Sequence, residues 1–313
     1  MAYESMKKQN FGIEIELTGI TRGEAAAVIA EYFGTRSRHA GGAYDPYTAT
    51  DHKGRVWRAM TDGSIDTKKR VNGVLISANR DYSCEVVSPI LQYEDIEDLQ
   101  EIVRLLRKKG AIANSSCGIH VHVDGKDHTP ESLTRLMGFA IGRQDLFYEA
   151  LGIGKRANHW CRKMNRDLLK AMQKDTEKTR DSLERIWYSA VNDGYSGGID
   201  HRHYNSSRYH GINLHAFFTK GTVEFRLFNG TTHAGKIKAY VQFCLAMSAW
   251  AIDCQDTRLY FKGCAGYTAE QKATLMTNVL VKRLGLGGAE FKTCRQHLTA
   301  PFRPQTEAAA EVA

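Results

Sequence analysis

Glu14 and Glu16 occupy the same face of a short apolar stretch near the N-terminus, FGIEIEL. In this stretch, residues 11–17, apolar side chains alternate with Gly, Glu and Glu, which is the period-two pattern of a half-buried strand. Same-face neighbours on a strand lie ~7 Å apart, so two bare carboxylates would repel by ~2 kcal/mol at an effective dielectric constant of ~20. One strand alone fits two explanations: a solvated polar face, or a cation held by the two carboxylates.

Three further strand-like stretches repeat this pattern. They carry ionisable side chains opposite their apolar ones: Glu85 in CEVVS (84–88), His120 and His122 in GIHVHVD (118–124), and Glu224 and Arg226 in TVEFRLF (222–228). Taken singly, each stretch can be the polar outer face of a strand. If the four strands share one sheet, that face carries several metal ligands and an arginine that can bind an anion.

The types of these side chains indicate which metal they could hold. Three or more carboxylates with one or two imidazoles suit Mg²⁺ or Mn²⁺ better than a structural zinc ion with thiolate ligands. Such cations beside an arginine commonly hold phosphate groups. The chain has no G-x-x-x-x-G-K-[ST] motif and no G-x-G-x-x-G after a strand, and its GLGG (285–288) follows a helical pattern. Nucleotide binding would therefore use a sheet face with metals.

The elements that must position these residues form an α+β pattern. Helices are expected at residues 21–34, where Thr21 and Glu24 form a capping box, and at 93–110, 129–152, 234–254 and 268–284. Strands are expected at 11–17, 55–61, 73–77, 84–88, 118–124, 212–218 and 222–228. The TKG between the last two predicts a hairpin. The pattern therefore predicts a largely antiparallel sheet covered on one face by helices.

Length and composition are those of an ordinary globular protein. Of 313 residues, 42% are hydrophobic and 25% charged, and no apolar run approaches the ~20 residues of a membrane span. We expect a single catalytic domain over 1–300, a disordered tail over 301–313, a cytoplasmic location and no membrane partner. The seven cysteines include no C-x-x-C pair, so Cys84 and Cys117 are expected to be small buried residues.

Positive charge is concentrated in one part of the chain. The net charge is +8, and residues 155–185 hold ten Lys and Arg against five Asp and Glu. Such a run can bind a polyanion, including nucleic acid, or can form a solvated helical face. We expect a helical insertion over about 155–190, which could form a wall of a substrate cleft.

Six short motifs occur in an order that resembles the amidoligase family. They are FGIEIEL, TDGSI (61–65), CEVVSP (84–89), CGIHVHVD (117–124), NSSRYHGINLH (205–215) and TVEFRLFNGT (222–231). The resemblance covers roughly residues 9–255. It implies a glutamine synthetase-like catalytic fold and an ATP-dependent ligase that joins a carboxylate to an amine through an acyl phosphate.

The resemblance also implies roles for individual residues. The residues at the family's positions for binding two or three Mg²⁺ or Mn²⁺ ions are Glu14, Glu16, Glu85, His120 and Glu224. Arg226 would meet a phosphate or a substrate carboxylate, and Arg208 a phosphate, with Asn213 in the same motif. His122 would help bind the nucleotide. Asp62, in TDGS, can equally be catalytic or a turn residue.

The substrates stay open, and two other classes of protein compete. The carboxylate and amine could belong to an amino acid, a peptide or a modified nucleic-acid base. A metal-dependent hydrolase would use the same acids and histidines without ATP, and a nucleic-acid-binding protein would use the basic segment. Residues 37–48 and 192–203, both containing Gly and Tyr, are candidate loops for closing over the site.

Overall fold

The structure, a computed structural model, describes residues 4–191, 198–254 and 263–303. Backbone contacts divide the chain into two compact units. The strand-rich unit comprises Asn10–Val121 and Phe228–Tyr240, and the helix-rich unit comprises Met1–Gln9, His122–Leu227 and Val241–Ala313. Within the described ranges, no helix has both the length and the apolar character needed to cross a bilayer.

Eight strands of the described chain form one sheet in the order β2-β3-β4-β7-β1-β8-β10-β9. Their bounds are β1 Phe11–Leu17, β2 Arg38–His39, β3 Tyr47–Thr50, β4 Val56–Met60, β7 Cys84–Val87, β8 Gly118–Asp124, β9 Ile212–Asn213 and β10 Thr222–Asn229. The pairs β1·β7, β4·β7, β3·β4, β2·β3 and β9·β10 are antiparallel. The structure therefore confirms an α/β mixture with a large antiparallel sheet.

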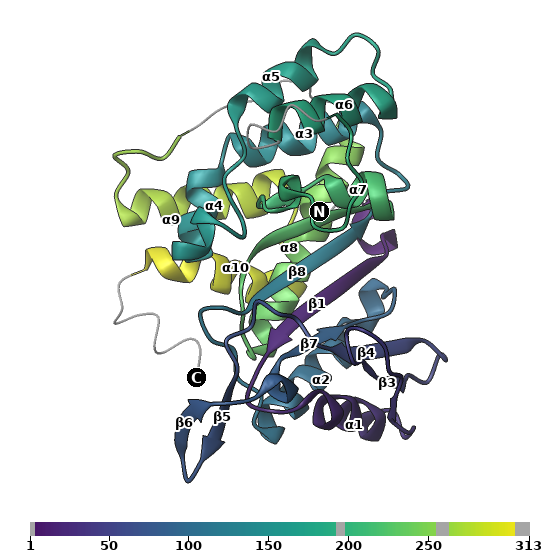
Figure 1. Ribbon diagram of the computed structural model, residues 1–313. Helices are drawn as coiled ribbons and strands as arrows, with labels where there is room; N and C mark the ends of the chain where they lie inside the picture. The colour runs from purple at the N-terminus through teal and green to yellow at the C-terminus, as the bar shows by residue number, and fades with distance from the viewer. Residues whose placement is uncertain (1–3, 192–197, 255–262, 304–313) are drawn as a thin grey trace. The chain divides into compact units, whose positions relative to one another are not determined.

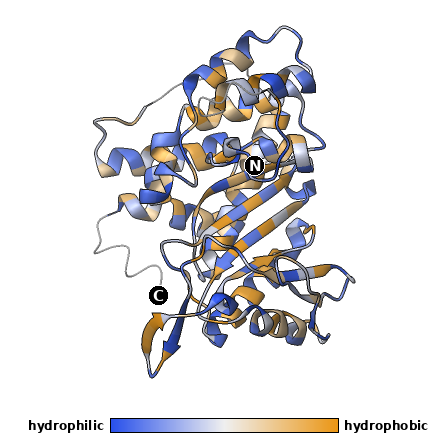
Figure 2. Cartoon of the chain, viewed as in Figure 1, coloured by the Kyte–Doolittle hydropathy of each residue, from blue (hydrophilic) through white to orange (hydrophobic). Residues whose placement is uncertain are grey.

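The alternation of side chains along β1 separates a core face from a polar face. Phe11, Ile13, Ile15 and Leu17 are at most 2% exposed. The same banding of hydrophilic and hydrophobic residues is visible along β1 and β8 in Figure 2. Burial of such side chains contributes roughly 1.5–3 kcal/mol each, so a one-residue slip of β1 would be strongly unfavourable. The register of β1 thus assigns its two glutamates to the other face.

Two helices cover the strands of the strand-rich unit. Helix α1, Arg22–Tyr32, contacts β3, β4 and β7, and also packs on α2, Ile96–Lys109 (Figure 1). Thr21 and Glu24 form the expected capping box at the start of α1. Helix α2 ends at Gly110, whose φ of 116° is the left-handed conformation expected of a helix-terminating glycine. The helix signals in this part of the sequence are therefore confirmed.

The helix-rich unit contains most of the remaining helices. Their bounds are α3 Pro130–Ile141, α4 Gln144–Ala150, α5 Arg166–Lys174, α6 Arg180–Val191, α7 His215–Lys220, α9 Ala269–Asn278 and α10 Lys292–Thr299, while α8, Ala234–Asp253, contributes to both units. Helix α5 packs against α3 and α6. From residue 166 on, the basic segment therefore folds mainly as the helices α5 and α6.

One predicted strand is wrong. The sequence pattern predicts a strand over 212–218, but the strand β9 ends at Asn213 and a short helix, α7, follows. The side-chain Oδ1 of Asn213 accepts a hydrogen bond from the backbone N–H of His215 at 2.8 Å, and Gly221 ends the helix with φ 74°. In this helix, Phe217 and Phe218 are buried, each 7% exposed. A short apolar run does not discriminate the two states by itself.

The other expected strands and helices differ less from the observed ones. The expected strand at 73–77 is β6, Val74–Ser77, which pairs with β5, Lys68–Val71, in a separate two-stranded sheet. The expected helix at 129–152 is two helices, α3 and α4, and α9 is shorter than expected because a π-helical turn, Val279–Arg283, follows it. Most of the expected tail lies outside the described residues.

Candidate active site

Three strands of the strand-rich unit bring Glu16, Glu85 and His120 together. Glu16 of β1 is directly opposite Glu85 of β7 in the antiparallel register, so both side chains are on one face. One ligand atom from each of Glu16, Glu85 and His120 lies within 4.8 Å of the others. Glu16 and His120 are 4% and 3% exposed. Buried acids this close are costly unless a cation or hydrogen bonds compensate their charge.

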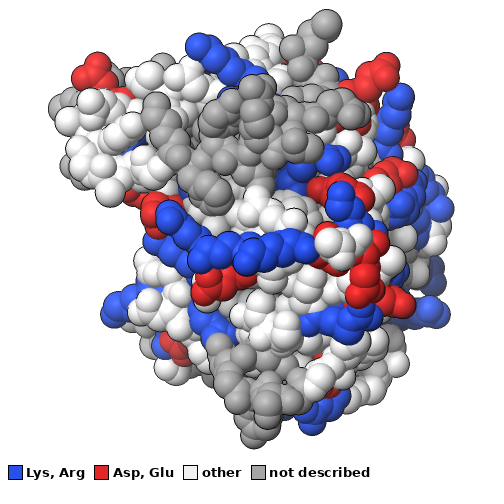
Figure 3. Space-filling model, turned by 90° about the horizontal axis from the view of Figure 1, so that it is seen from above, with Lys and Arg blue, Asp and Glu red and all other residues white. Residues whose placement is uncertain are grey.

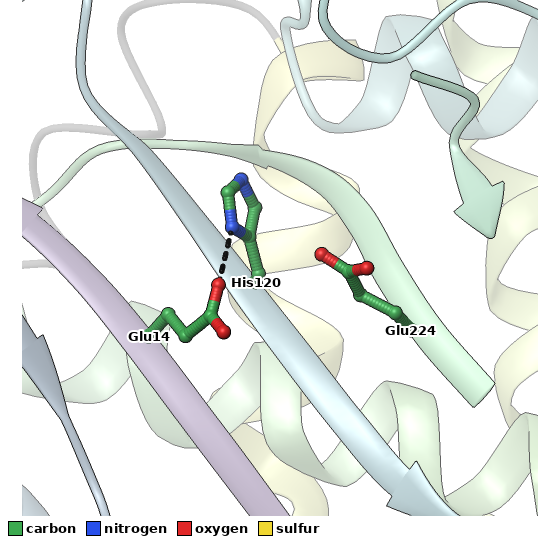
Figure 4. A group of neighbouring side chains, drawn as sticks. All are labelled: Glu14, His120 and Glu224. Atoms are coloured by element: carbon green, nitrogen blue, oxygen red, sulfur yellow. Dashed lines mark hydrogen bonds and ion pairs between the residues drawn. The ribbon is translucent and has the colours of Figure 1, made fainter. Parts of the chain in front are cut away.

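His120 is placed beside both glutamates of β1. Its Nδ1 atom lies 2.9 Å from Oε2 of Glu14, a hydrogen bond drawn in Figure 4. Its Nε2 atom lies 3.8 Å from Oε1 of Glu16. The backbone N–H of Gly118 donates to Oε2 of Glu16 at 2.6 Å and so orients that carboxylate. The first residue of β8 therefore holds the carboxylate of Glu16 in place.

This set of donor atoms fits a hard divalent cation. The oxygen atoms come from three carboxylates, Glu14, Glu16 and Glu85, and the nitrogen from His120. Mg²⁺ and Mn²⁺ prefer oxygen-rich ligand sets, and Mn²⁺ also accepts imidazole. Cys84 and Cys117 are buried nearby in the sequence, and burial raises the pKa of the Cys84 thiol to about 12. At neutral pH the Cys84 thiol is therefore protonated and a poor metal ligand.

The helix-rich unit has a second cluster, centred on Glu224 of β10. Nη1 of Arg226 donates to Oε1 of Glu224 at 2.5 Å, and Nδ2 of Asn213 donates to Oε2 at 2.6 Å. Nε2 of His122 lies 3.8 Å from Oε1 of Glu224. The antiparallel pairing of β9 with β10 puts Asn213 opposite Glu224, which explains this contact. Glu224, Arg226 and Asn213 are all at most 4% exposed.

The two candidate arginines lie near one aromatic ring. The guanidinium carbon of Arg226 is 5.9 Å from the centre of the Tyr209 ring, and that of Arg208 is 5.7 Å from it. Nε of Arg226 also donates to the backbone oxygen of Trp160 at 3.4 Å. Tyr209 was not expected from the sequence. The tyrosine next to Arg208 in the motif NSSRYHGINLH was the available signal.

His215 is a second residue that the sequence reasoning missed. Nδ1 of His215 lies 2.6 Å from the hydroxyl oxygen of Tyr188 on α6. Burial, and then the nearby charge of Arg208, lowers the pKa of His215 to about 4, so the ring is neutral at pH 7. Residues 201–215 hold four of the twelve histidines of the chain, and this density was the signal that could have identified the region.

Asp62 has the contacts of a turn residue. Its Oδ1 atom accepts a hydrogen bond from the backbone N–H of Ser64 at 2.6 Å. Its own backbone N–H donates to Oγ of Ser83 at 3.0 Å, and that hydroxyl donates to the carbonyl of Asp62 at 2.6 Å. These contacts support the turn interpretation and give no support to a catalytic role.

The basic segment is partly neutralised by its own contacts. Lys163 pairs with Asp145 at 2.6 Å, and Arg185 pairs with Glu177 at 2.7 Å. Acidic side chains also adjoin basic ones on the face shown in Figure 3. Arg156 is only 7% exposed, and Nη2 of Arg162 donates to the backbone oxygen of Ser206 at 3.1 Å. Several basic side chains of this segment therefore make ion pairs or hydrogen bonds within the protein.

Of the two candidate closing loops, the structure describes one completely and the other only in part. Residues 37–48 contain β2 and the first residues of β3, and Asp45 in this stretch pairs with Arg22 of α1 and with His39. The other loop, 192–203, lies partly outside the described residues. The ion pair between Asp45 and Arg22 therefore connects the first loop to helix α1.

The expected metal ligands and anion-binding residues form one cluster in each unit. Glu14, Glu16, Glu85 and His120 are gathered in the strand-rich unit, and His122, Arg208, Asn213, Glu224 and Arg226 belong to the helix-rich unit. His120 and His122 are two residues apart on the same strand, β8, so the division between the units falls between these two side chains.

The chain matches a family of known proteins. The model of a family described as "Putative amidoligase enzyme" matches residues 7–248, which include every candidate site residue. No curated protein matches the chain.

Proposed function

The chain belongs to the amidoligase family, and we propose that it is an ATP-dependent ligase joining a carboxylate to an amine. A carboxylate oxygen of one substrate attacks the γ-phosphorus of ATP, which gives an acyl phosphate and ADP. The amine nitrogen of the second substrate then attacks the acyl carbon, loses a proton, and displaces inorganic phosphate. The product is an amide or isopeptide bond.

The observation that carries this proposal is the close grouping of Glu16, Glu85 and His120 on three strands. A structural role gives no reason to place two acids opposite each other beside a histidine, because like charges across a strand pair destabilise it. A divalent cation removes that penalty. The match to an amidoligase family then favours ligase chemistry among the reactions that use such cations.

We propose that the same-face residues of β8 and their neighbours bind a metal–nucleotide complex. Alternate residues of a strand point to the same face, so His120 and His122 are same-face neighbours on β8. His122 is in turn 3.8 Å from Glu224. Glu14, Glu16, Glu85, His120 and Glu224 would hold two or three Mg²⁺ or Mn²⁺ ions. Such ions, when bound, would polarise the γ-phosphate and neutralise charge on the phosphates.

Arg226 would stabilise the group in transfer. Its guanidinium stays charged at any working pH and offers donors in a fork that matches phosphate or carboxylate oxygens. Glu224 and Trp160 already orient it, so little conformational entropy is lost when an anion binds. Pre-oriented donors of this kind are typical of sites where negative charge develops.

The competing functions have less support. A hydrolase that activates a metal-bound water gains little from a buried arginine beside a candidate ligand. The basic segment includes residues that pair with acids, such as Lys163 with Asp145 and Arg185 with Glu177, which weakens the argument for a nucleic-acid surface. Neither the clusters nor the family match favours these alternatives over a ligase.

The test is ATP consumption with Mg²⁺ and pools of amino acids, peptides and amines as substrates. We expect release of ADP and phosphate that requires the metal and both substrates, and its loss in Glu16→Gln. The surface variant Asp167→Asn is a matched control, because its pairing partner, Lys170, is also exposed. Bond cleavage without nucleotide, unaffected by Glu16→Gln, would overturn the assignment.

A further inference from the structure

A pocket in the helix-rich unit lies beside Glu224 and has a volume of about 180 Å³. Its buried side includes Asn213, His215 and Glu224, which are 1–5% exposed. Its solvent side includes Lys220, the last residue of α7, and the half-buried Arg208. The pocket therefore runs from solvent to a carboxylate of the proposed metal site.

The charges around this pocket favour an anion. The two carboxylate oxygens of Glu224 already accept hydrogen bonds from Arg226 and Asn213. His201, which also lines the pocket, lies 2.6 Å from Glu184, and the negative charge of Glu184 offsets any positive charge on His201. Arg208 and Lys220 contribute the remaining full charges of the lining, and both are positive.

Arg208 is held in a defined orientation. Its Nη1 atom donates to the backbone oxygen of His203 at 2.9 Å. Its guanidinium carbon lies 5.9 Å from the centre of the Tyr204 ring and 5.7 Å from that of Tyr209. Stacking and hydrogen bonding of this kind reduce the entropy lost when a guanidinium binds an oxyanion.

The size of the pocket limits what it can hold. Its volume is about 180 Å³. Pockets that enclose a whole drug-sized ligand are larger, roughly 300–1,000 Å³. The pocket therefore suits one end of a substrate rather than a complete nucleotide.

We propose that this pocket binds an oxyanion group, a carboxylate or a phosphate, of the substrate that is to be ligated. The inference rests on the proposed function and narrows it to substrates with a negative group close to the reacting group. Arg208 supplies the planar fork for that group, and Lys220 supplies a second charge from the solvent side. The bound group would adjoin Glu224, and thus the proposed site of activation.

The test is calorimetric binding without ATP or metal, at low ionic strength, with three probes. Glutarate and inorganic phosphate carry oxyanions, and glutaramide, in which both carboxylates are amides, is the uncharged counterpart of glutarate. We expect at least one anion to bind, and glutaramide to bind roughly 10-fold more weakly than glutarate if the carboxylate is the ligand. Arg208→Gln and Lys220→Gln should weaken anion binding by roughly 10-fold or more, since each removes a charged donor.

Lys174→Gln is the matched control, because Lys174 is an exposed lysine at the end of α5, outside the pocket lining. Binding of neither anion, or equal weakening in Lys174→Gln, would overturn the proposal. Displacement of the anion by metal-free ATP, together with loss of ATP binding in Arg208→Gln, would also overturn it by assigning the pocket to the nucleotide. Anion binding without any metal-dependent ADP release would instead count against the ligase function and leave the pocket assignment intact.

Discussion

Nη1 of Arg226 donates to Oε1 of Glu224 over 2.5 Å, and both side chains are at most 4% exposed. The two residues are same-face neighbours on β10, so the strand itself sets their proximity. The pair combines a candidate metal ligand with a candidate anion-binding group. Its arginine should therefore be needed for catalysis and also for stability.

Replacing Arg226 should nearly abolish turnover. Loss of a pre-oriented donor to developing charge costs about 10²–10³ in rate, and Arg226→Lys should recover little because an ammonium group lacks the planar fork. Steady-state ADP release with saturating substrates measures the effect. Arg226→Ala should also lower the stability of the fold, because the buried carboxylate of Glu224 loses this cation. The activity of the variant should therefore be assayed below the melting temperature of the variant.

The exposed Arg185 of α6 is the control for that variant, because it pairs with Glu177 at the surface. Arg185→Ala should keep wild-type turnover. Equal losses in Arg185→Ala and Arg226→Lys would remove the case for a catalytic role.

Glu16→Gln and Glu85→Gln should weaken Mn²⁺ binding. Each substitution removes a charge from the cluster and keeps its shape, and in Glu16→Gln the new amide oxygen can still accept the hydrogen bond from Gly118. We expect an affinity loss of at least about 10-fold, as for changes at metal-site residues in general. Calorimetry or Mn²⁺ electron paramagnetic resonance without ATP measures it. Unchanged Mn²⁺ affinity in both variants would contradict a metal site on this face.

Stability should fall in mild acid because His128 is buried as the neutral ring. Its two nitrogens lie 2.9 Å from Oγ of Ser132 and 2.8 Å from Oγ of Ser248. Burial lowers the pKa of His128 from 6.5 to about 4, and His215 shifts in the same direction. The stabilisation is therefore complete above about pH 6.5 and is lost as the pH falls toward 4. The loss is about 3 kcal/mol for a shift of this size.

Urea unfolding at pH 7.5, 6 and 5 measures this dependence. His128→Gln, which can still bond to a serine, should lose less stability over that range than the wild type does. An identical pH dependence in the two proteins would show that His128 is not the titrating group.

Asp95 should be important for the strand-rich unit. It is 2% exposed and pairs with Arg55 at 2.7 Å and Lys53 at 2.8 Å. Burial raises its pKa, but the hydrogen bonds from Arg55 and Lys53 outweigh burial, so the net pKa of Asp95 is lowered. Asp95→Asn should cost roughly 1.5–3 kcal/mol, because the buried side chain loses its charged hydrogen bonds, whereas Arg55 and Lys53, 22% and 36% exposed, can be solvated.

Chemical unfolding of the variant measures this cost. The pair Glu101 and Arg104 on α2 is the control, because its side chains are 42% and 55% exposed. Glu101→Gln should change the free energy of unfolding by less than about 0.5 kcal/mol. A similar small effect for Asp95→Asn would show that its pairs with Arg55 and Lys53 add little.

Local patterns in the sequence determined the elements that carry the site. The alternation in residues 11–17 and 118–124 predicted β1 and β8 with their observed bounds, because burying one face leaves only one register. The capping box at Thr21 and the glycine at 110 marked the ends of helices for equally local reasons. These signals also identified which acids and histidines share a face with one another.

Only the tertiary structure decided which of these side chains meet. Glu16 lies opposite Glu85 because β1 pairs with β7, a contact between strands far apart in the chain. Helix α7 lies where a strand was expected: the side chain of Asn213 accepts a hydrogen bond from the backbone N–H of His215, and the two phenylalanines of the helix are buried. His215 and Tyr209 acquired their positions through contacts with Tyr188 and the two arginines. Side-chain type and spacing contain no information on such non-local partners, because packing between distant segments selects them.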